Sequence, residues 1–266
     1  ITSANAATMN AERGAIEIST NSGNITLDSD TITANTNLIV DAKAGSGYGG
    51  SVTLGTADAN PADTATATTG YIDITAAVAV TTNAELDAAT YIDIEAGGDI
   101  NLNEALEAQG ANAAGVGIKI LSTGGNITAV DAATMDAPAG AIDIRTNDGN
   151  INLESDTVSA STNLIVYAGQ TDDGSVTLGG GTNTPDIFTV GTGYIDITAA
   201  GSVTTTEAEL SAATGTYIDI DAGTTADIGE LDAASYVDIF AINDIETTGL
   251  INAGTTVLVK SQDGSI

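Results

Sequence analysis

A pair of aliphatic residues separated by one other residue recurs eleven times along this chain of 266 residues. Alternation with period two is typical of a β-strand whose apolar side chains all point to one side. Because neighbouring pairs lie only 19 to 34 residues apart, the chain has room for short strands and turns between them, and for little else. The pairs are Ile16/Ile18, Leu38/Val40, Ile72/Ile74, Ile92/Ile94, Ile118/Ile120, Ile142/Ile144, Leu164/Val166, Ile195/Ile197, Ile218/Ile220, Val237/Ile239 and Val257/Val259.

A glycine-containing turn and a second aliphatic pair follow most of these strands. Gly23-Asn24, for example, precedes Ile25/Leu27. Gly and Asn tolerate the positive φ of tight corners. A third, Ala-flanked strand often follows, centred on Ile32, Leu86, Leu106, Val158 or Leu210. The repeat predicts an all-β fold, a parallel β-helix of about 11 coils of roughly 20–25 residues.

A longer repeat overlies the coils. The segment "TMNAERGAIEISTNSGNITL" from Thr8 matches "TMDAPAGAIDIRTNDGNINL" from Thr134, an offset of 126 residues. We therefore expect a five-coil module over residues 1–126 and a homologous six-coil module over residues 127–266, continuous with the first. The two widest gaps between aliphatic pairs predict loops out of the coil at Thr56–Thr69 and Gly179–Gly191.

The two ends of the chain match an internal segment. If Ile266 is overlaid on Ile1, the join reads "VLVKSQDGSITSANAATM", which parallels "IKILSTGGNITAVDAATM" from Ile118. Solenoids usually carry capping repeats, and we expect this one to be open at both ends, with residues 1–265 forming one period of a continuing stack. The predicted end-to-end junction involves Ile1, Val257, Val259 and Ile266.

The motif "YIDI", with "YVDI" as its last version, contains five of the seven tyrosines. When its aliphatic residues face inward, its Tyr and Asp face outward, and equivalent residues of stacked coils lie about 4.8 Å apart. Two tyrosine ladders follow, for which stabilising ring stacking is expected and a sugar-binding aromatic strip is the functional alternative. Their members are Tyr71 and Tyr91, then Tyr194, Tyr217 and Tyr236.

A column of aspartates runs beside the tyrosines. Asp196, Asp219 and Asp238 are predicted to lie one above another, where neighbouring carboxylates repel by about 1 kcal/mol in water and more at lower dielectric. Splayed, solvated side chains relieve this repulsion, and bridging Ca²⁺, which prefers oxygen ligands, is the alternative. No EF-hand loop is present, and we predict no required cofactor or firm metal site.

Composition excludes several classes of function. The chain has no Cys, His or Trp, and 36 acidic residues face 5 basic ones, for a net charge of −31. Such a surface repels nucleic acids and anionic lipid, and no apolar run approaches the roughly 20 residues that span a bilayer. We therefore expect no nucleic-acid partner and no membrane insertion.

The stretch "YIDIEAGGDINLNEALEAQG", Tyr91 to Gly110, resembles the repeat of filamentous haemagglutinin-type exoproteins, the large two-partner-secretion adhesins. The same pattern covers nearly all of the chain. The resemblance implies a right-handed parallel β-helix exported to the cell surface, with adhesive or matrix roles.

We expect a secreted structural fibre or adhesin-stalk segment that continues end to end, through tandem repetition or head-to-tail assembly. A discrete self-assembling subunit with Ca²⁺-bridged or sugar-binding ladders is the alternative, with host or matrix glycans as partners. A polysaccharide-active enzyme is a minor alternative because acidic pairs recur in every coil, whereas catalysis needs a unique constellation. Ice binding is another, because the threonine runs Thr64–Thr69 and Thr204–Thr206 do not recur at coil spacing.

Overall fold

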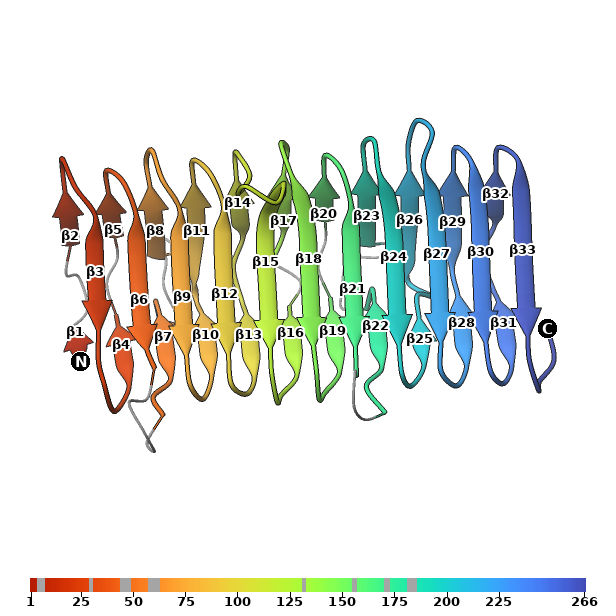
Figure 1. Cartoon of the computed structure of the whole chain (residues 1–266), viewed down its shortest axis with the longest axis horizontal. Coiled ribbons are helices and arrows are strands. Elements are labelled where there is room, and N and C mark those ends of the chain that lie inside the picture. Colours follow the sequence, from red (N-terminus) through yellow and green to blue (C-terminus); the bar gives the residue numbers. More distant parts are fainter. Residues whose placement is uncertain are drawn as a thin grey trace.

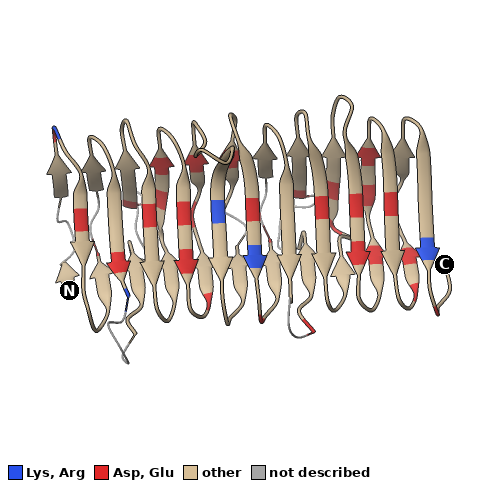
Figure 2. Cartoon of the chain, viewed as in Figure 1, with Lys and Arg blue, Asp and Glu red and all other residues tan. Residues whose placement is uncertain are grey.

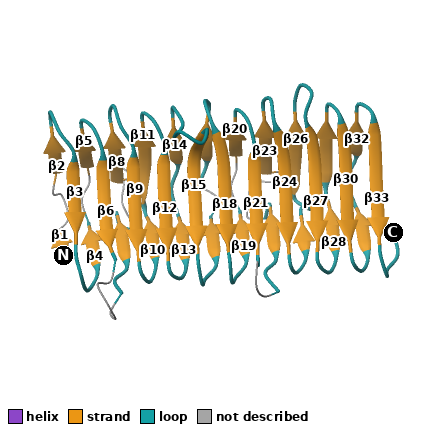
Figure 3. Cartoon of the chain, in the orientation of Figure 1, coloured by secondary structure: helices purple, strands orange, loops and turns teal. Residues whose placement is uncertain are grey.

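The computed structural model describes residues 1–3, 8–28, 31–43, 49–56, 63–130, 133–154, 157–169, 173–180 and 186–266. Within these ranges the chain forms β-strands, turns and loops, and no helix (Figure 3). No helix there could therefore cross a membrane. The strands belong to three sheets of 11 strands each, which we call sheets A, B and C.

Sheet C contains the strands that carry the recurrent aliphatic pair. Each apolar residue of the pair alternates with an outward residue, and in the interior coils the pair is fully buried. The strands are β3 (Ile16–Ser19), β6 (Leu38–Ala42), β9 (Ile72–Ala76), β12 (Ile92–Ala96), β15 (Val116–Ser122), β18 (Ala141–Thr146), β21 (Leu164–Ala168), β24 (Tyr194–Ala199), β27 (Tyr217–Ala222), β30 (Tyr236–Ala241) and β33 (Thr256–Ser261).

Sheet A contains the aliphatic pairs that follow the glycine-containing turns. Its strands are short because a single inward pair fills each one. They are β1 (Thr2–Ser3), β4 (Ile25–Leu27), β7 (Val52–Leu54), β10 (Val80–Thr82), β13 (Ile100–Leu102), β16 (Ile127–Ala129), β19 (Ile151–Leu153), β22 (Val176–Leu178), β25 (Val203–Thr204), β28 (Ala226–Ile228) and β31 (Ile245–Thr247).

Sheet B contains the third, alanine-rich strand of each coil. Its strands are β2 (Thr8–Ala11), β5 (Thr31–Ala34), β8 (Asp63–Ala67), β11 (Ala84–Ala88), β14 (Leu106–Ala108), β17 (Met135–Ala137), β20 (Thr157–Ala160), β23 (Asp186–Val190), β26 (Ala208–Ala212), β29 (Glu230–Ala233) and β32 (Ile251–Ala253).

Every strand pairs in parallel with the strand three places on, which is the equivalent strand of the next coil. A coil is thus one strand of each sheet in the order A, B, C, and coil 1 consists of β1, β2 and β3. Figure 1 shows the three rows of strands running the length of the molecule, with the N- and C-termini at opposite ends. The predicted all-β parallel solenoid of about 11 coils is confirmed. The sheets continue through residues 126 and 127, and the division into two modules stays a prediction from the sequence.

The core is one continuous column of aliphatic side chains between the three sheets. In sheet C, Ile72, Ile92, Ile118 and Ile142 lie directly above one another, and each is fully buried. Burying such a side chain contributes roughly 1.5–3 kcal/mol. The stack is therefore stabilised in equal increments along its length rather than by one central cluster.

The corner between sheets C and A depends on close approach of the backbone. A Cβ on Gly125 would lie 2.5 Å from the backbone nitrogen of Asp99 in the coil before it, so only glycine fits there. The residue before the sheet A strand bridges the coils: Asp99 Oδ1 accepts from the Asn126 N–H at 2.8 Å, and Asn126 Oδ1 accepts from the Asn150 N–H at 2.9 Å. Our interpretation of these asparagines as residues that tolerate a positive φ was incomplete, because their side chains also join one coil to the next.

Both segments predicted to loop out of the coil end in strands of sheet B. Residues 57–62 and 181–185 lie outside the described part of the chain. However, Asp63–Ala67 and Asp186–Val190 are strands of sheet B in register with their neighbours, and not loops. The prediction was wrong because both segments keep the period-two alternation but use Asp, Ala and Phe inward instead of the aliphatic pair.

Replacing Ile144 by Ala should lower the free energy of unfolding by about 2–5 kcal/mol, because it leaves a cavity between two packed coils. The matched change Ile18→Ala, at the equivalent position of coil 1, should cost less because Ile18 is only partly buried. Urea denaturation followed by circular dichroism measures both. Equal losses for the two variants would contradict the layered core described here.

Candidate functional site

The five tyrosines of the repeated motif lie where the sequence placed them, on the outer face of sheet C. Tyr71 stacks on Tyr91 with ring centroids 4.8 Å apart and planes within 9°. Tyr217 lies between Tyr194, at 5.1 Å, and Tyr236, at 4.7 Å. The strand register enforces this contact, because Tyr194 and Tyr217 are direct partners across the two strands.

The stacking decides which ring surfaces are free. A sugar ring binds an aromatic side chain through its face, and in both ladders the faces are used between the tyrosines themselves. Only the outer face of each terminal ring stays available, because neither ladder continues with a further tyrosine in the described coils. This geometry favours a structural role for the ladders over a flat sugar-binding strip.

Aspartates and a few basic residues occupy the neighbouring outward column. In coils 4 to 6, Lys119 stands between Asp93 and Asp143, with its Nζ 3.3 Å from Asp93 Oδ1 and in contact with Glu95. Arg145 Nε donates to Asp143. The charges of this part of the column are therefore partly balanced.

Coils 8 to 10 lack such compensation in the column itself. Asp196, Asp219 and Asp238 lie directly above one another, and Asp221 lies on the same strand as Asp219. Figure 2 shows acidic residues along the length of the solenoid and only a few basic ones. Lys260, one coil further on, lies over the ring of Phe240 at 5.6 Å rather than against a carboxylate.

The uncompensated negative charge of coils 8 to 10 contributes to a raised pKa of one carboxyl group in the column. Partial burial, followed by the charges of Asp221, Asp238 and Asp196, raises the pKa of Asp219 to about 6. Burial also raises the pKa of Asp93, although the nearby Lys119 ammonium opposes the effect. Burial alone would lower the pKa of Lys119, but its hydrogen bond to Glu95 and the charge of Asp93 raise it.

The aspartate column does not form a cation cage among the described residues, where no group of three or more acidic side chains is arranged to hold a metal ion. Its carboxylates follow one line along the stack, whereas Ca²⁺ takes six to eight oxygens around a centre. Asp196, Asp219 and Asp238 can relieve their repulsion by splaying into solvent, and Asp219, whose pKa is raised, can also do so by taking up a proton.

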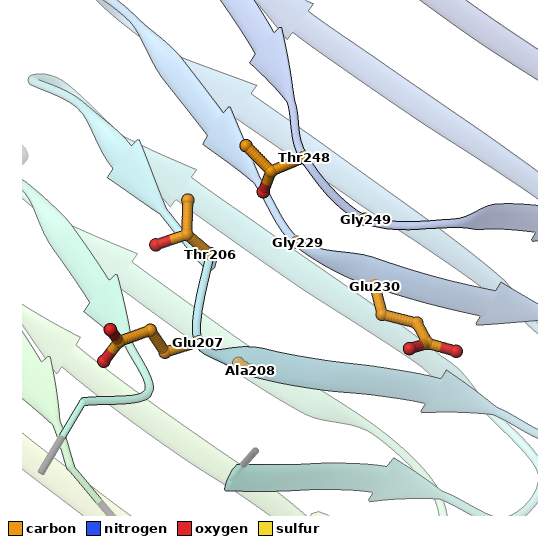
Figure 4. A pocket seen from close by; sticks show the side chains of 7 residues that line it. All are labelled: Thr206, Glu207, Ala208, Gly229, Glu230, Thr248 and Gly249. Carbon is orange, nitrogen blue, oxygen red and sulfur yellow. The ribbon is translucent and has the colours of Figure 1, made fainter. Parts of the chain in front are cut away.

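A hollow of about 330 Å³ lies at the corner between sheets A and B in the last three coils. Figure 4 shows the carboxylates of Glu207 and Glu230 pointing away from each other, with the hydroxyls of Thr206 and Thr248 nearby. Glycoside hydrolysis needs two carboxyl groups facing one substrate from opposite sides. The lining residues of this hollow do not have that arrangement.

Two buried acids were missed by the sequence analysis. Asp63 and Asp186 are each 1 % exposed and take the first inward position of β8 in coil 3 and of β23 in coil 8. Asp63 Oδ2 accepts a hydrogen bond from the Thr56 N–H at 2.8 Å. The period-two alternation of residues 63, 65 and 67 was a signal for inward positions, but an inward Asp contradicts the apolar template.

The predicted junction residues lie at the two ends of the stack. Val257 is 44 %, Ile1 55 % and Ile266 72 % exposed, while Val259 is partly buried against the core. Ile1 N–H donates to Asn24 O at 2.8 Å, as the Ile245 N–H does to Ser265 O at 2.9 Å. Ile266 therefore stands in the same position of its coil as Ile1.

Comparisons of the chain with protein-family models, with curated proteins and with solved structures found no match. The fold and the geometry of its own residues define a parallel β-solenoid repeat protein.

Replacing Tyr217 by Ala removes two ring contacts, and replacing Tyr91 by Ala removes one. At about 0.5–1.5 kcal/mol for each aromatic pair, Tyr217→Ala should be the more destabilising change. The shift in the midpoint of urea denaturation measures the difference. Stabilities that do not change in either variant would remove the structural role of the ladders.

The raised pKa of Asp219 predicts that stability falls as pH rises. A carboxyl whose pKa increases from 3.8 unfolded to about 6 folded stabilises the fold fully below pH 3.8, and this contribution is lost as pH rises through 6. Asp219→Asn should therefore stabilise the protein at pH 7 by on the order of 1 kcal/mol, after allowance for solvent screening. It should also flatten the pH dependence of the melting temperature between pH 4 and 7.

Asp143→Asn is the matched control, since Asp143 occupies the same column but has Arg145 as its partner. This change should not raise stability at pH 7. If Asp219→Asn gave no more stability than Asp143→Asn at that pH, the repulsion assigned to coils 8 to 10 would be wrong.

Proposed function

We propose that this solenoid is a structural segment of an extracellular fibre or adhesin stalk, of the kind found in filamentous haemagglutinin-type exoproteins. The observation that carries the proposal is the uniformity of the coils. Eleven strands in each sheet repeat the same inward and outward pattern, and the acidic groups recur along the outside rather than converging on one site. A rod of this kind spaces and presents whatever is attached to it, and its role in this proposal is neither catalytic nor dependent on a cofactor.

Charge and strand pairing support an extracellular location. With 5 Lys and Arg in the chain, trypsin-like proteases have few cleavage sites. Two of these residues, Lys119 and Arg145, lie within paired strands of sheet C and are held by ion pairs. The resemblance of Tyr91–Gly110 to secreted adhesin repeats points in the same direction. The acidic surface disfavours nucleic acids and anionic membranes as partners.

The ends of the stack support continuation of the rod. Edge strands present unpaired backbone groups that another strand can extend, and the last coil exposes Leu250, Val257 and Leu258 at 67 %, 44 % and 51 %. Ile266 begins a coil in the position of Ile1. In the proposed fibre, a further coil of the same type covers each end, either in a tandem array or in a separate copy of the chain.

The chain should therefore assemble into rods one solenoid wide whose length increases in steps of about 50 Å, the height of eleven coils at about 4.8 Å each. Light scattering and negative-stain electron microscopy measure the mass and the shape. Assembly should increase with ionic strength, because the Debye length falls from about 30 Å at 0.01 M salt to about 8 Å at 0.15 M and so screens the charge of −31.

Val259→Asp places a charge on the end face and should prevent assembly, since an unpaired buried charge is strongly unfavourable. Ile187→Asp is the matched control, because Ile187 is exposed on the side of the rod in β23 and not at an end. A monomer of 26.2 kDa at every concentration and ionic strength would refute end-to-end continuation.

A further inference from the structure

The first coil of the chain closely matches an interior one. Coil 1 reads "ITSANAATMNAERGAIEISTNSGN" and coil 6 reads "ITAVDAATMDAPAGAIDIRTNDGN" from Ile127. The inward residues are the same in sheets B and C, and in sheet A Ser3 stands where coil 6 has Ala129. Coil 6 packs on coil 5, where Met135, Ile142 and Ile144 are fully buried. The equivalent Met9, Ile16 and Ile18 of coil 1 are only partly buried. The face of coil 1 thus has the side chains of a covered face, without the cover.

The last coil matches the coil beneath coil 6. In coil 5, Ser122 Oγ donates to Gly98 O at 2.7 Å and accepts from the Gly125 N–H at 3.0 Å. In coil 11, Ser261 Oγ donates to Asn243 O at 2.6 Å and accepts from the Gly264 N–H at 2.9 Å. The turn of coil 11 therefore presents the same backbone carbonyl, that of Gly264 in place of Gly125, to whatever lies above it.

One threonine hydroxyl has a different hydrogen-bond acceptor in coil 6, which packs on coil 5, than in coil 1, which packs on no preceding coil. Thr146 of coil 6 is fully buried, and its Oγ1 donates to Gly125 O of coil 5 at 2.7 Å. Thr20, its equivalent in coil 1, has no coil beneath it and donates to Ser22 O in its own turn at 2.7 Å. If coil 1 lay on coil 11, Thr20 could donate to Gly264 O as Thr146 does to Gly125 O.

From these matches we infer that the face of coil 11 binds coil 1 of a second copy of this chain, in the register of the coil 5–coil 6 contact. The inference rests on the proposed function and specifies its joint. Val257 then lies against Ile16, Val259 against Ile18 and Ile251 against Met9.

The outer surface of the joint is compatible with this register. The direct neighbours on sheet C are Leu258 with Glu17, and Lys260 with Ser19, so that Lys260 lies diagonal to Glu17 and within reach of its carboxylate. On sheet B, Asn252 lies opposite Asn10. Lys260 is one of 5 basic residues in the chain, and this register brings it close to an acid of the second copy. Ile266 occupies the place that Ile1 of the second copy takes in the joint, so the joint requires this terminal residue to move out of that position.

Introduced cysteines test the register directly, because the chain has no native Cys. Directly opposed residues of neighbouring strands lie about 4.8 Å apart, within the 4.4–6.8 Å range of Cα separations in disulfides. The double variant Asn10→Cys/Asn252→Cys should form a ladder of disulfide-linked multimers under mild oxidation. A bond within one chain is excluded because the two residues lie ten coils apart, roughly 48 Å at this spacing.

Thr8→Cys/Asn252→Cys is the matched control. Thr8 faces outward on the same strand as Asn10 but two residues earlier, which places the two Cα atoms roughly 8 Å apart, beyond disulfide reach. This variant should assemble without forming the ladder. Mixing the single variants Asn10→Cys and Asn252→Cys should give a disulfide-linked dimer only, which tests the joint again with one substitution in each chain.

The outcomes separate the joint from the proposed function. If rods form and the Thr8→Cys/Asn252→Cys variant gives disulfide-linked multimers, the inferred register is wrong. The register is also wrong if rods form but neither double variant gives such multimers. Both outcomes leave end-to-end continuation intact. Absence of rods in the unsubstituted chain at all ionic strengths would overturn both. A ladder in the Asn10 variant alone, together with the dimer of the mixed single variants, is the result expected for the inferred joint.

Discussion

The whole structure depends on parallel pairing between each strand and the equivalent strand one coil on. This pairing places equivalent positions of successive coils about 4.8 Å above one another, so many side chains have a residue of the same type as their neighbour. For the inward positions the rule is favourable at each step. Ile92 on Ile72 and Ile118 on Ile92 build an aliphatic core, in which Phe188 is the one fully buried aromatic side chain among the described residues.

On the outer face the same rule helps some residues and opposes others. Tyrosines benefit, because stacked rings at about 5 Å bury their faces against each other. Stacked aspartates repel each other, and the two halves of the chain differ in whether a basic residue separates them. Lys119 interrupts the column in coil 5, whereas Asp196, Asp219 and Asp238 follow one another without a base between them. The raised pKa of Asp219 is the physical consequence.

Parallel pairing of this kind leaves an unpaired edge strand in each sheet at both ends of the stack. Ile16 and Ile18 at one end, and Val257 and Val259 at the other, are inward side chains that no further coil covers. The contact of coil 6 on coil 5 supplies a ready template for covering them, down to the hydroxyl of Thr146 on the Gly125 carbonyl. The proposed fibre and its joint both follow from this one property of the stack.

The sequence by itself determined the strands, their inward residues and the outward columns of Tyr and Asp. Period-two alternation and a near-constant coil length are local features, and once coils stack they imply the neighbours of Tyr217 or Asp219 without further information. Only the tertiary structure decided where the stack resumes after an interruption, as at Asp63–Ala67 and Asp186–Val190. It also decided that Asn126 bridges two coils, that Asp63 is buried and that Asp219 holds its proton more tightly than usual. These properties depend on which residues of the adjoining coil are in contact. Where a loop interrupts the repeat, the spacing along the sequence no longer identifies these residues.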